Sequence, residues 1–377
     1  MGWSGGPCLV VRCRPDLVFE AAGLLAAERD CDKAQLATGI RLPWCVEDQT
    51  LPGMSVPAEG ARVAWQDVPE SARRAIEGVC GSAVIEARTQ PGGFSPGLAA
   101  RVRCADGTRW FVKAASAELN RDAPRMHRQE AMVLADLDPL ILAEHLPVPR
   151  LRGTVERGPW FALVVDDVDG RQPVVPWRDY ELDLVLAALD RLVEALTPVP
   201  ATVMSTAPAI AEYLGDDFSG WRALARTPGD DRLDPWSRAR LAELAALEAT
   251  WAAHAAGDTL LHADIRADNL LLTAKGVASD RVMVVDWPHA CRGAAFVDLV
   301  GFAPSVAMQG GPEPAELLAR SRAGRNVSRE SLAAVVCALA GYFTERSLQP
   351  PPPGLPTVRQ FQAAQGEVTR RWLATLL

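Results

Sequence analysis

Residues 260–273 run Leu-Leu-His-Ala-Asp-Ile-Arg-Ala-Asp-Asn-Leu-Leu-Leu-Thr, which places polar residues on a loop between two short apolar runs. His262, Asp264 and Asn269 stand there at His-x-Asp-x-x-x-x-Asn spacing. A second apolar run, residues 282–285, leads directly into Asp286. A short strand that ends in an aspartate holds that side chain rigidly. The sequence therefore predicts a site built from these two loops.

The four polar residues suit phosphoryl transfer, which needs few protein groups. Asp264 is the candidate catalytic residue, because a carboxylate can orient an acceptor hydroxyl. Asn269 and Asp286 are the candidate magnesium ligands, because Mg²⁺ prefers hard oxygen donors. We group His262 with Asp264 in the catalytic loop and expect it to brace that loop without transferring protons. The expected cofactor is Mg²⁺, and ATP is the expected co-substrate.

The residues before this loop include groups that can bind the phosphates of a nucleotide. A glycine-rich turn joins two predicted strands and can bring backbone N–H groups close to phosphate oxygens. Its candidate nucleotide contacts are Gly92, Gly93, Phe94 and Ser95. Lys113 is predicted to end the third strand and to point toward the phosphates. Glu130, on the helix that follows, is the predicted partner of Lys113.

The pattern of apolar residues predicts an α+β fold with two lobes. Predicted strands lie at residues 84–90, 98–104, 110–114, 151–155 and 160–165, with Asp106-Gly107 as a hairpin turn. Helical spacing dominates from residue 182 onward. Asp234 and Pro235 predict the start of a helix whose apolar face continues through Leu241 and Leu244. Residues 332–343 predict a buried helix, and Thr357 with Gln360 predicts a capping box for the last helix. We expect a peripheral, poorly ordered segment at 1–55, a small antiparallel-sheet lobe at 56–165 and a mostly helical lobe at 166–377. Met54 is a candidate for the true start of the protein.

Composition narrows the class of protein. The 377 residues are 49% hydrophobic and 23% charged, as in a soluble globular protein. The net charge of −8 argues against a nucleic-acid partner. No apolar run is long enough to span a membrane, and the N-terminus lacks a signal peptide. The eight scattered cysteines fit a reduced, cytoplasmic protein. Oligomeric state is not readable from the sequence.

From about residue 65 onward the chain resembles the aminoglycoside phosphotransferase and choline kinase group of kinase-like enzymes, especially its actinobacterial-type members. The resemblance rests on residues 90–97 (Gln-Pro-Gly-Gly-Phe-Ser-Pro-Gly), 266–273 and 284–288 (Val-Val-Asp-Trp-Pro). It implies a kinase-like fold and transfer of the γ-phosphate to a small-molecule hydroxyl. It also implies that Asp167 and Val168 lie in the connector that binds adenine, and that Asp298 braces the catalytic loop.

Two departures separate this chain from protein kinases and close relatives. Asp286-Trp-Pro replaces the Asp-Phe-Gly of protein kinases, and only about ten residues lie between Asp286 and Asp298, too few for a regulated activation segment. A protein substrate is therefore not expected. Ala263 stands where close relatives often carry an aromatic residue, which we expect to loosen the loop or widen the pocket.

Two alternatives remain open at this stage. One is a nucleotide-binding regulatory module without useful catalysis. The other is a metal-dependent hydrolase that uses His262, Asp264 and Asp286. Five acidic residues favour a cationic acceptor if they face the site, and are solvated loop residues if they do not. They are Glu212, Asp216, Asp217, Asp230 and Asp231.

Overall fold

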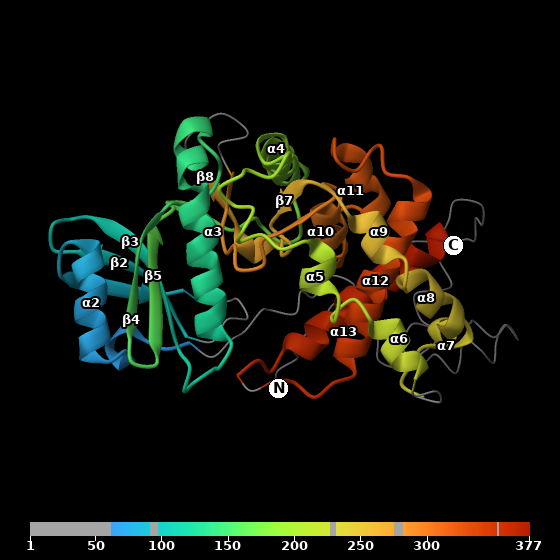
Figure 1. The fold of residues 1–377 in the computed structure, drawn as a ribbon, viewed down its shortest axis with the longest axis horizontal. Helices are drawn as coiled ribbons and strands as arrows, with labels where there is room; N and C mark the ends of the chain where they lie inside the picture. The colour runs from blue at the N-terminus through green and yellow to red at the C-terminus, as the bar shows by residue number, and fades with distance from the viewer. Residues whose placement is uncertain (1–61, 91–96, 227–230, 275–281, 353) are drawn as a thin grey trace, which may run out of the picture. The chain divides into compact units, whose positions relative to one another are not determined.

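A five-stranded antiparallel sheet forms the first part of the fold, in the order β1-β2-β3-β5-β4 (Figure 1). Its strands are β1 (Val84–Thr89), β2 (Leu98–Cys104), β3 (Arg109–Ser116), β4 (Leu151–Arg157) and β5 (Trp160–Asp166). Each lies where a strand was predicted. The hairpin between β2 and β3 turns at Asp106, whose Oδ1 accepts from the Thr108 N–H at 2.9 Å, and at Gly107, whose φ of 88° favours glycine.

The computed structural model describes residues 62–90, 97–226, 231–274, 282–352 and 354–377. All of them belong to one compact unit, Pro52–Leu377. The predicted peripheral segment 1–55, with Met54, lies outside the described residues. The same holds for the predicted nucleotide contacts Gly92, Gly93, Phe94 and Ser95.

Alternation along β3 gives the sheet two different faces. Val112 and Ala114 are buried in a cluster with α2 (Glu70–Cys80). Lys113 lies between them in the sequence and points to the opposite face, where α3 (Ala123–Glu144) packs. Figure 1 shows α2 and α3 on the two sides of the sheet. Because successive side chains of a strand point to opposite faces of the sheet, Lys113 contacts α3.

The rest of the described chain is mostly helical, as predicted. Its helices are α4 (Asp179–Ala195), α5 (Ile210–Leu214), α6 (Gly220–Ala225), α7 (Pro235–Ala239), α8 (Leu241–Glu248), α9 (Trp251–Ala255), α10 (Val297–Met308), α11 (Pro314–Arg320), α12 (Arg329–Ser347) and α13 (Val358–Leu376). Residues 333–341 of α12 are all buried, which confirms the predicted buried helix. No helix in the described ranges is both long enough and apolar enough to cross a bilayer.

Short strands hold the loops that carry the predicted site. β7 (Thr259–Leu261) pairs with β10 (Cys291–Gly293), and β6 (Gly170–Arg171), β8 (Leu270–Thr273) and β9 (Val282–Val284) form a small antiparallel sheet. Two 3-10 turns complete the element list, η1 (Trp65–Asp67) and η2 (Ala267–Asn269).

Three local predictions need correction. Lys113 lies inside β3, because the ladder with β5 continues to Ser116. The helix predicted to start at Pro235 is capped by Asp234 as expected, but it ends before Arg240, whose backbone is non-helical, and α8 is separate. α13 begins at the predicted Thr357, but this residue is in the αR region, outside the extended conformation that a capping box needs.

Candidate active site

The catalytic loop leaves β7 at Leu261 and reaches β8 through η2. Ala263 within it has a φ of 60°, and Asp286, at the end of β9, has a φ of 71°. Positive φ is unfavourable for residues other than glycine and persists only where the surroundings enforce it. Two of the three described non-glycine residues with positive φ therefore lie in the predicted site, and the third is His145 at the C-terminal end of α3.

Asp298, near the start of α10, enforces the loop conformation. Its Oδ2 accepts from the His262 N–H at 2.9 Å and its Oδ1 accepts from the Ala263 N–H at 2.7 Å. Burial raises the pKa of Asp298 to about 6, although both N–H groups oppose the shift. The expected brace is therefore formed. Because Ala263 is anchored through its backbone, its small side chain does not loosen the loop there.

His262 is a buried structural residue of this loop. Its Nε2 lies 3.0 Å from the Val285 carbonyl oxygen, and its Nδ1 accepts from the Asp264 N–H at 3.2 Å. The ring also packs edge-on against Trp287, with 4.8 Å between centroids. Burial lowers the pKa of His262 to about 4. Both ring nitrogens are engaged, which fits bracing and leaves neither for the zinc hydrolase alternative.

Asp264 is the centre of a network of charged side chains. Arg266 Nη1 donates to Oδ1 at 2.6 Å and to Oδ2 at 2.9 Å, and Asn269 Nδ2 donates to Oδ2 at 3.1 Å. Arg266 is held in turn by Asp268 through two bonds of 3.0 Å. Burial raises the pKa of Asp264, and the guanidinium of Arg266 opposes that shift. The carboxylate is thus fixed in orientation.

Lys113 joins the sheet to the second predicted loop. Its Nζ donates to Glu130 Oε1 and Oε2, both at 2.8 Å, and to Asp286 Oδ1 at 2.6 Å. Burial lowers the pKa of Lys113, but the two carboxylates outweigh it and hold the pKa above its ordinary value. Burial likewise opposes ionisation of Asp286, but the neighbouring Lys113 ammonium group keeps the pKa of Asp286 below its usual range. The predicted lysine–glutamate pair is therefore formed, with Asp286 as a third member.

Asn269 and Asp286 lie at the same end of the β8–β9 hairpin. The register pairs Leu270 with Val284, and the Val285 N–H donates to the Asn269 carbonyl at 3.0 Å. Asn269 Nδ2 donates to Asp264, which leaves Oδ1 as an acceptor. These are hard oxygen donors of the kind Mg²⁺ takes, usually with phosphates and water. Within the described ranges no group of three or more His, Cys, Asp or Glu side chains could hold a metal.

A profile described as the phosphotransferase enzyme family matches residues 92–334, which span most of the sheet, the catalytic loop and Asp286. The chain belongs to the phosphotransferase enzyme family. A comparison with curated proteins gave no match.

Solved structures show the same kinase-like fold as this phosphotransferase-family chain. The GDP complex of aminoglycoside 2′-phosphotransferase-IIIa is 15% identical, covers 78% of this chain and 94% of that chain, and has a TM-score of 0.53. Spectinomycin phosphotransferase with ADP and spectinomycin is 14% identical, with coverages of 80% and 94% and a TM-score of 0.52. Choline kinase from Streptococcus pneumoniae is 12% identical, with coverages of 80% and 97% and a TM-score of 0.52. At these identities the likeness concerns the fold alone.

The connector of this phosphotransferase-family chain is tied back to the sheet. Asp167 is almost fully buried, its Oδ2 accepts from Arg109 Nε at 2.9 Å, and its Oδ1 lies 3.1 Å from Arg101 Nε. The second contact is an ion pair outside hydrogen-bond alignment. Among the predicted nucleotide contacts, the Asp167 side chain is therefore committed to two arginines.

Several site residues were not singled out from the sequence. Arg266 and Asp268 lie inside the quoted motif, so their i, i+2 spacing around Asp264 was the available signal. Tyr213 Oη lies 2.7 Å from His289 Nδ1, and His289 follows Asp286 by three residues. Arg101 contacts the connector across 67 residues, and nothing local in the sequence indicates that contact.

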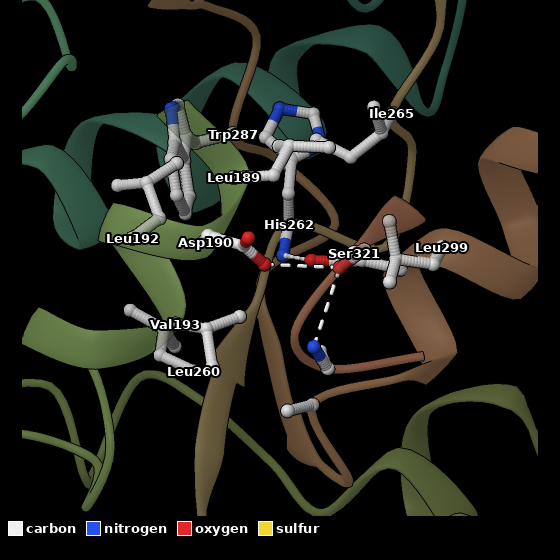
Figure 2. A pocket seen from close by; sticks show the side chains of 13 residues that line it. Leu189, Asp190, Leu192, Val193, Leu260, His262, Ile265, Trp287, Leu299 and Ser321 are labelled. Carbon is white, nitrogen blue, oxygen red and sulfur yellow. Dashed lines mark hydrogen bonds between the residues drawn. The ribbon is translucent and has the colours of Figure 1, made fainter. Parts of the chain in front are cut away.

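A cavity of about 20 Å³ adjoins the catalytic loop and is lined mainly by apolar side chains with His262 and Asp298 (Figure 2). Figure 2 also shows Ser321 bonded to Asp190 at its wall; the Ser321 Oγ donates at 2.9 Å. That volume holds about one water molecule. The cavity is therefore too small for a nucleotide.

His262 and Asp298 make opposite contributions to stability between about pH 4 and pH 6.5. The pKa of His262 falls from 6.5 to about 4 on folding, so its contribution rises with pH through this window. The pKa of Asp298 rises from 3.8 to about 6, so its contribution is full below about pH 4 and is lost as pH rises through 6. The two slopes partly cancel in the wild type.

The Asp298→Asn variant is expected to show the pH dependence of the free energy of unfolding that comes from His262. The variant should be less stable overall, because one loop N–H loses its acceptor. Its free energy of unfolding should rise more steeply with pH between 4.5 and 6.5 than that of the wild type, because the opposing aspartate titration is removed. Urea unfolding at four pH values in this window measures both slopes. Parallel curves for the two proteins would contradict the assignment.

Proposed function

We propose that this chain transfers the γ-phosphate of ATP to a hydroxyl of a small molecule. The strongest support is the contact of 2.6 Å between Lys113 Nζ and Asp286 Oδ1, which joins residues 173 positions apart. It brings a sheet lysine, its helix partner and a strand-end aspartate beside the loop that carries Asp264. Phosphoryl transfer depends mainly on such positioning and charge neutralisation.

Each residue has a distinct role in this proposal. Asp264 orients the acceptor hydroxyl and takes its proton late in the transfer, when that proton is most acidic. Lys113 contacts the nucleotide phosphates, and Glu130 fixes the direction of the ammonium group. His262 and Asp298 hold the loop in the conformation that presents Asp264.

Asn269 and Asp286 are the residues that would hold Mg²⁺. When bound, the ion supplies charge neutralisation for the nucleotide phosphates. Asp286 is already ionised beside Lys113, and the Asn269 amide is oriented by its bonds to Asp264. Asp286 therefore already has the charge, and Asn269 the orientation, that binding of the ion would require.

The nucleotide would lie between the sheet and the catalytic loop. We assign the phosphates to the backbone of Gly92, Gly93, Phe94 and Ser95, and the base to the connector at Asp167 and Val168. In this scheme 56–165 is the nucleotide-binding lobe and 166–377 is the catalytic and acceptor-binding lobe. Gly97, which follows the turn, lies tight against β3, since a Cβ there would lie 2.5 Å from the Ala114 carbonyl oxygen.

Two of the acidic residues considered for a cationic acceptor have a paired or fully solvated side chain. Asp217 is paired with Arg346 at 2.5 Å, and the Asp231 side chain is 98% exposed. Asp230 lies outside the described residues. The acceptor is therefore proposed only as a hydroxylated small molecule.

The proposal is tested by incubating the protein with Mg²⁺, ATP and a panel of hydroxylated metabolites and antibiotics. A product heavier than an acceptor by one phosphoryl group, formed only with ATP, is the expected result. Tight ADP binding without transfer to any of a broad panel would favour the regulatory module instead. Transfer that persists after chelation of divalent ions would contradict the magnesium role.

Glu130→Gln is expected to weaken ADP binding by about tenfold, equivalent to ~1.4 kcal/mol. The amide keeps the shape of the side chain but removes one of the two negative charges that share the Lys113 ammonium group. The ammonium is then drawn to Asp286 alone and presented less well to phosphates. Calorimetric titration with Mg²⁺ and ADP measures the effect. Glu156→Gln, on an exposed residue of β4, is the control and should leave binding unchanged.

A further inference from the structure

Arg101, on β2, spans from the sheet to the connector that follows β5. Its Nη2 donates to the Val168 carbonyl at 2.5 Å and to the Gly170 carbonyl at 3.2 Å. Its Nε forms the ion pair with buried Asp167. The side chain is only 25% exposed, so these contacts hold the guanidinium at the edge of the connector.

The two polar groups of Val168 differ sharply in their availability. A carbonyl oxygen has two lone pairs, and the Val168 oxygen already accepts from Arg101 Nη2 and from the Gly170 N–H at 2.9 Å. By contrast, no acceptor in the described part of the chain takes the Val168 N–H. Val168 therefore offers a base one open donor and a filled acceptor.

The two purine bases present different edges to such a connector. Adenine carries an acceptor at N1 beside the N6 amino donor, whereas guanine carries the acceptor O6 beside the donors N1–H and N2–H. In the same position as adenine, guanine would set its N1–H against the Val168 N–H. Shifted so that O6 accepts that N–H, guanine would turn its donors toward the Val168 carbonyl, which is filled.

We propose that Arg101 makes the nucleotide site selective for adenine over guanine by occupying the Val168 carbonyl. This inference rests on the proposed function, because it assumes that the base lies at the connector. Leaving a buried donor unpaired is what makes a site reject an otherwise similar ligand. The related structures that hold GDP and ADP show that both choices occur with this fold.

Calorimetric titration of the full chain with Mg²⁺ and either ADP or GDP tests the proposal. The wild type should bind ADP at least about tenfold more tightly than GDP. Arg101→Leu frees a lone pair on the Val168 oxygen, so GDP binding should strengthen and the ratio should fall to about threefold or less. Arg101→Lys keeps a donor near that oxygen and should retain most of the preference.

Arg103→Leu is the matched control, since Arg103 lies two residues along the same strand and pairs with exposed Glu86. It should leave the ratio unchanged. Equal binding of ADP and GDP by the wild type, or an unchanged ratio in a folded Arg101→Leu, would overturn this inference alone. Binding of neither nucleotide would overturn the proposed function and the inference together.

Discussion

Asp264→Asn is expected to lower the rate of phosphate transfer by about 10²- to 10⁴-fold, the range typical of a lost acid–base group. The amide cannot take the acceptor proton. Its NH₂ group would also face Arg266 Nη1, which now donates to both carboxylate oxygens. ADP affinity should stay within about threefold, because the proposed role of Asp264 is to contact the acceptor and not the nucleotide.

The measurement is the initial rate of product formation with the acceptor found by the mass screen. Asp268→Asn is the matched comparison, because it removes a carboxylate from the other side of Arg266 without touching the reacting centre. It should cost much less activity than Asp264→Asn. Equal rates for wild type and Asp264→Asn would remove Asp264 from its catalytic role.

Asp298→Ala is expected to give the largest loss of stability. It leaves the His262 and Ala263 N–H groups without their acceptor in a buried setting, at about 1–3 kcal/mol each. The expected loss of ~2–6 kcal/mol is a large part of the roughly 5–15 kcal/mol that stabilises a typical domain. The loop should also lose the strained Ala263 conformation, so transfer activity should fall in the protein that remains folded.

Urea unfolding at pH 7 measures this loss. Asp183→Ala is the control, because Asp183 is exposed and pairs with Arg320 at 2.5 Å. Such surface pairs contribute about 0–1 kcal/mol. A loss for Asp298→Ala as small as that of the control would mean that the two N–H groups do not depend on the carboxylate.

Most of the fold was predictable from local sequence patterns. Alternating apolar residues and the Asp106-Gly107 turn placed the sheet, and helical spacing placed the helices. The break at Arg240 was missed because no glycine or proline marks it and the apolar spacing runs through it. Lys113 was placed at a strand end because the apolar run weakens there, whereas the ladder with β5 continues.

The candidate site was predictable where its residues share one short motif, as His262, Asp264 and Asn269 do. The pair formed by Lys113 and Glu130 was predicted from a lysine on the third strand and a glutamate on the helix that follows, and the resemblance agreed with it. The contact of Arg101 with the Val168 carbonyl was not predictable in this way. A backbone oxygen is an acceptor at every residue, so only the tertiary structure shows which one an arginine meets.

The placement of Asn269 and Asp286 at one end of the β8–β9 hairpin has a consequence for protein engineering. The ladder runs from Leu270 paired with Val284 to Leu272 paired with Val282, so the chain between Thr273 and Val282 joins the strands at the far end. Lengthening or replacing that connection leaves the paired residues to set the distance between the two oxygen donors. A fluorescent label or an inserted peptide is therefore best attached there.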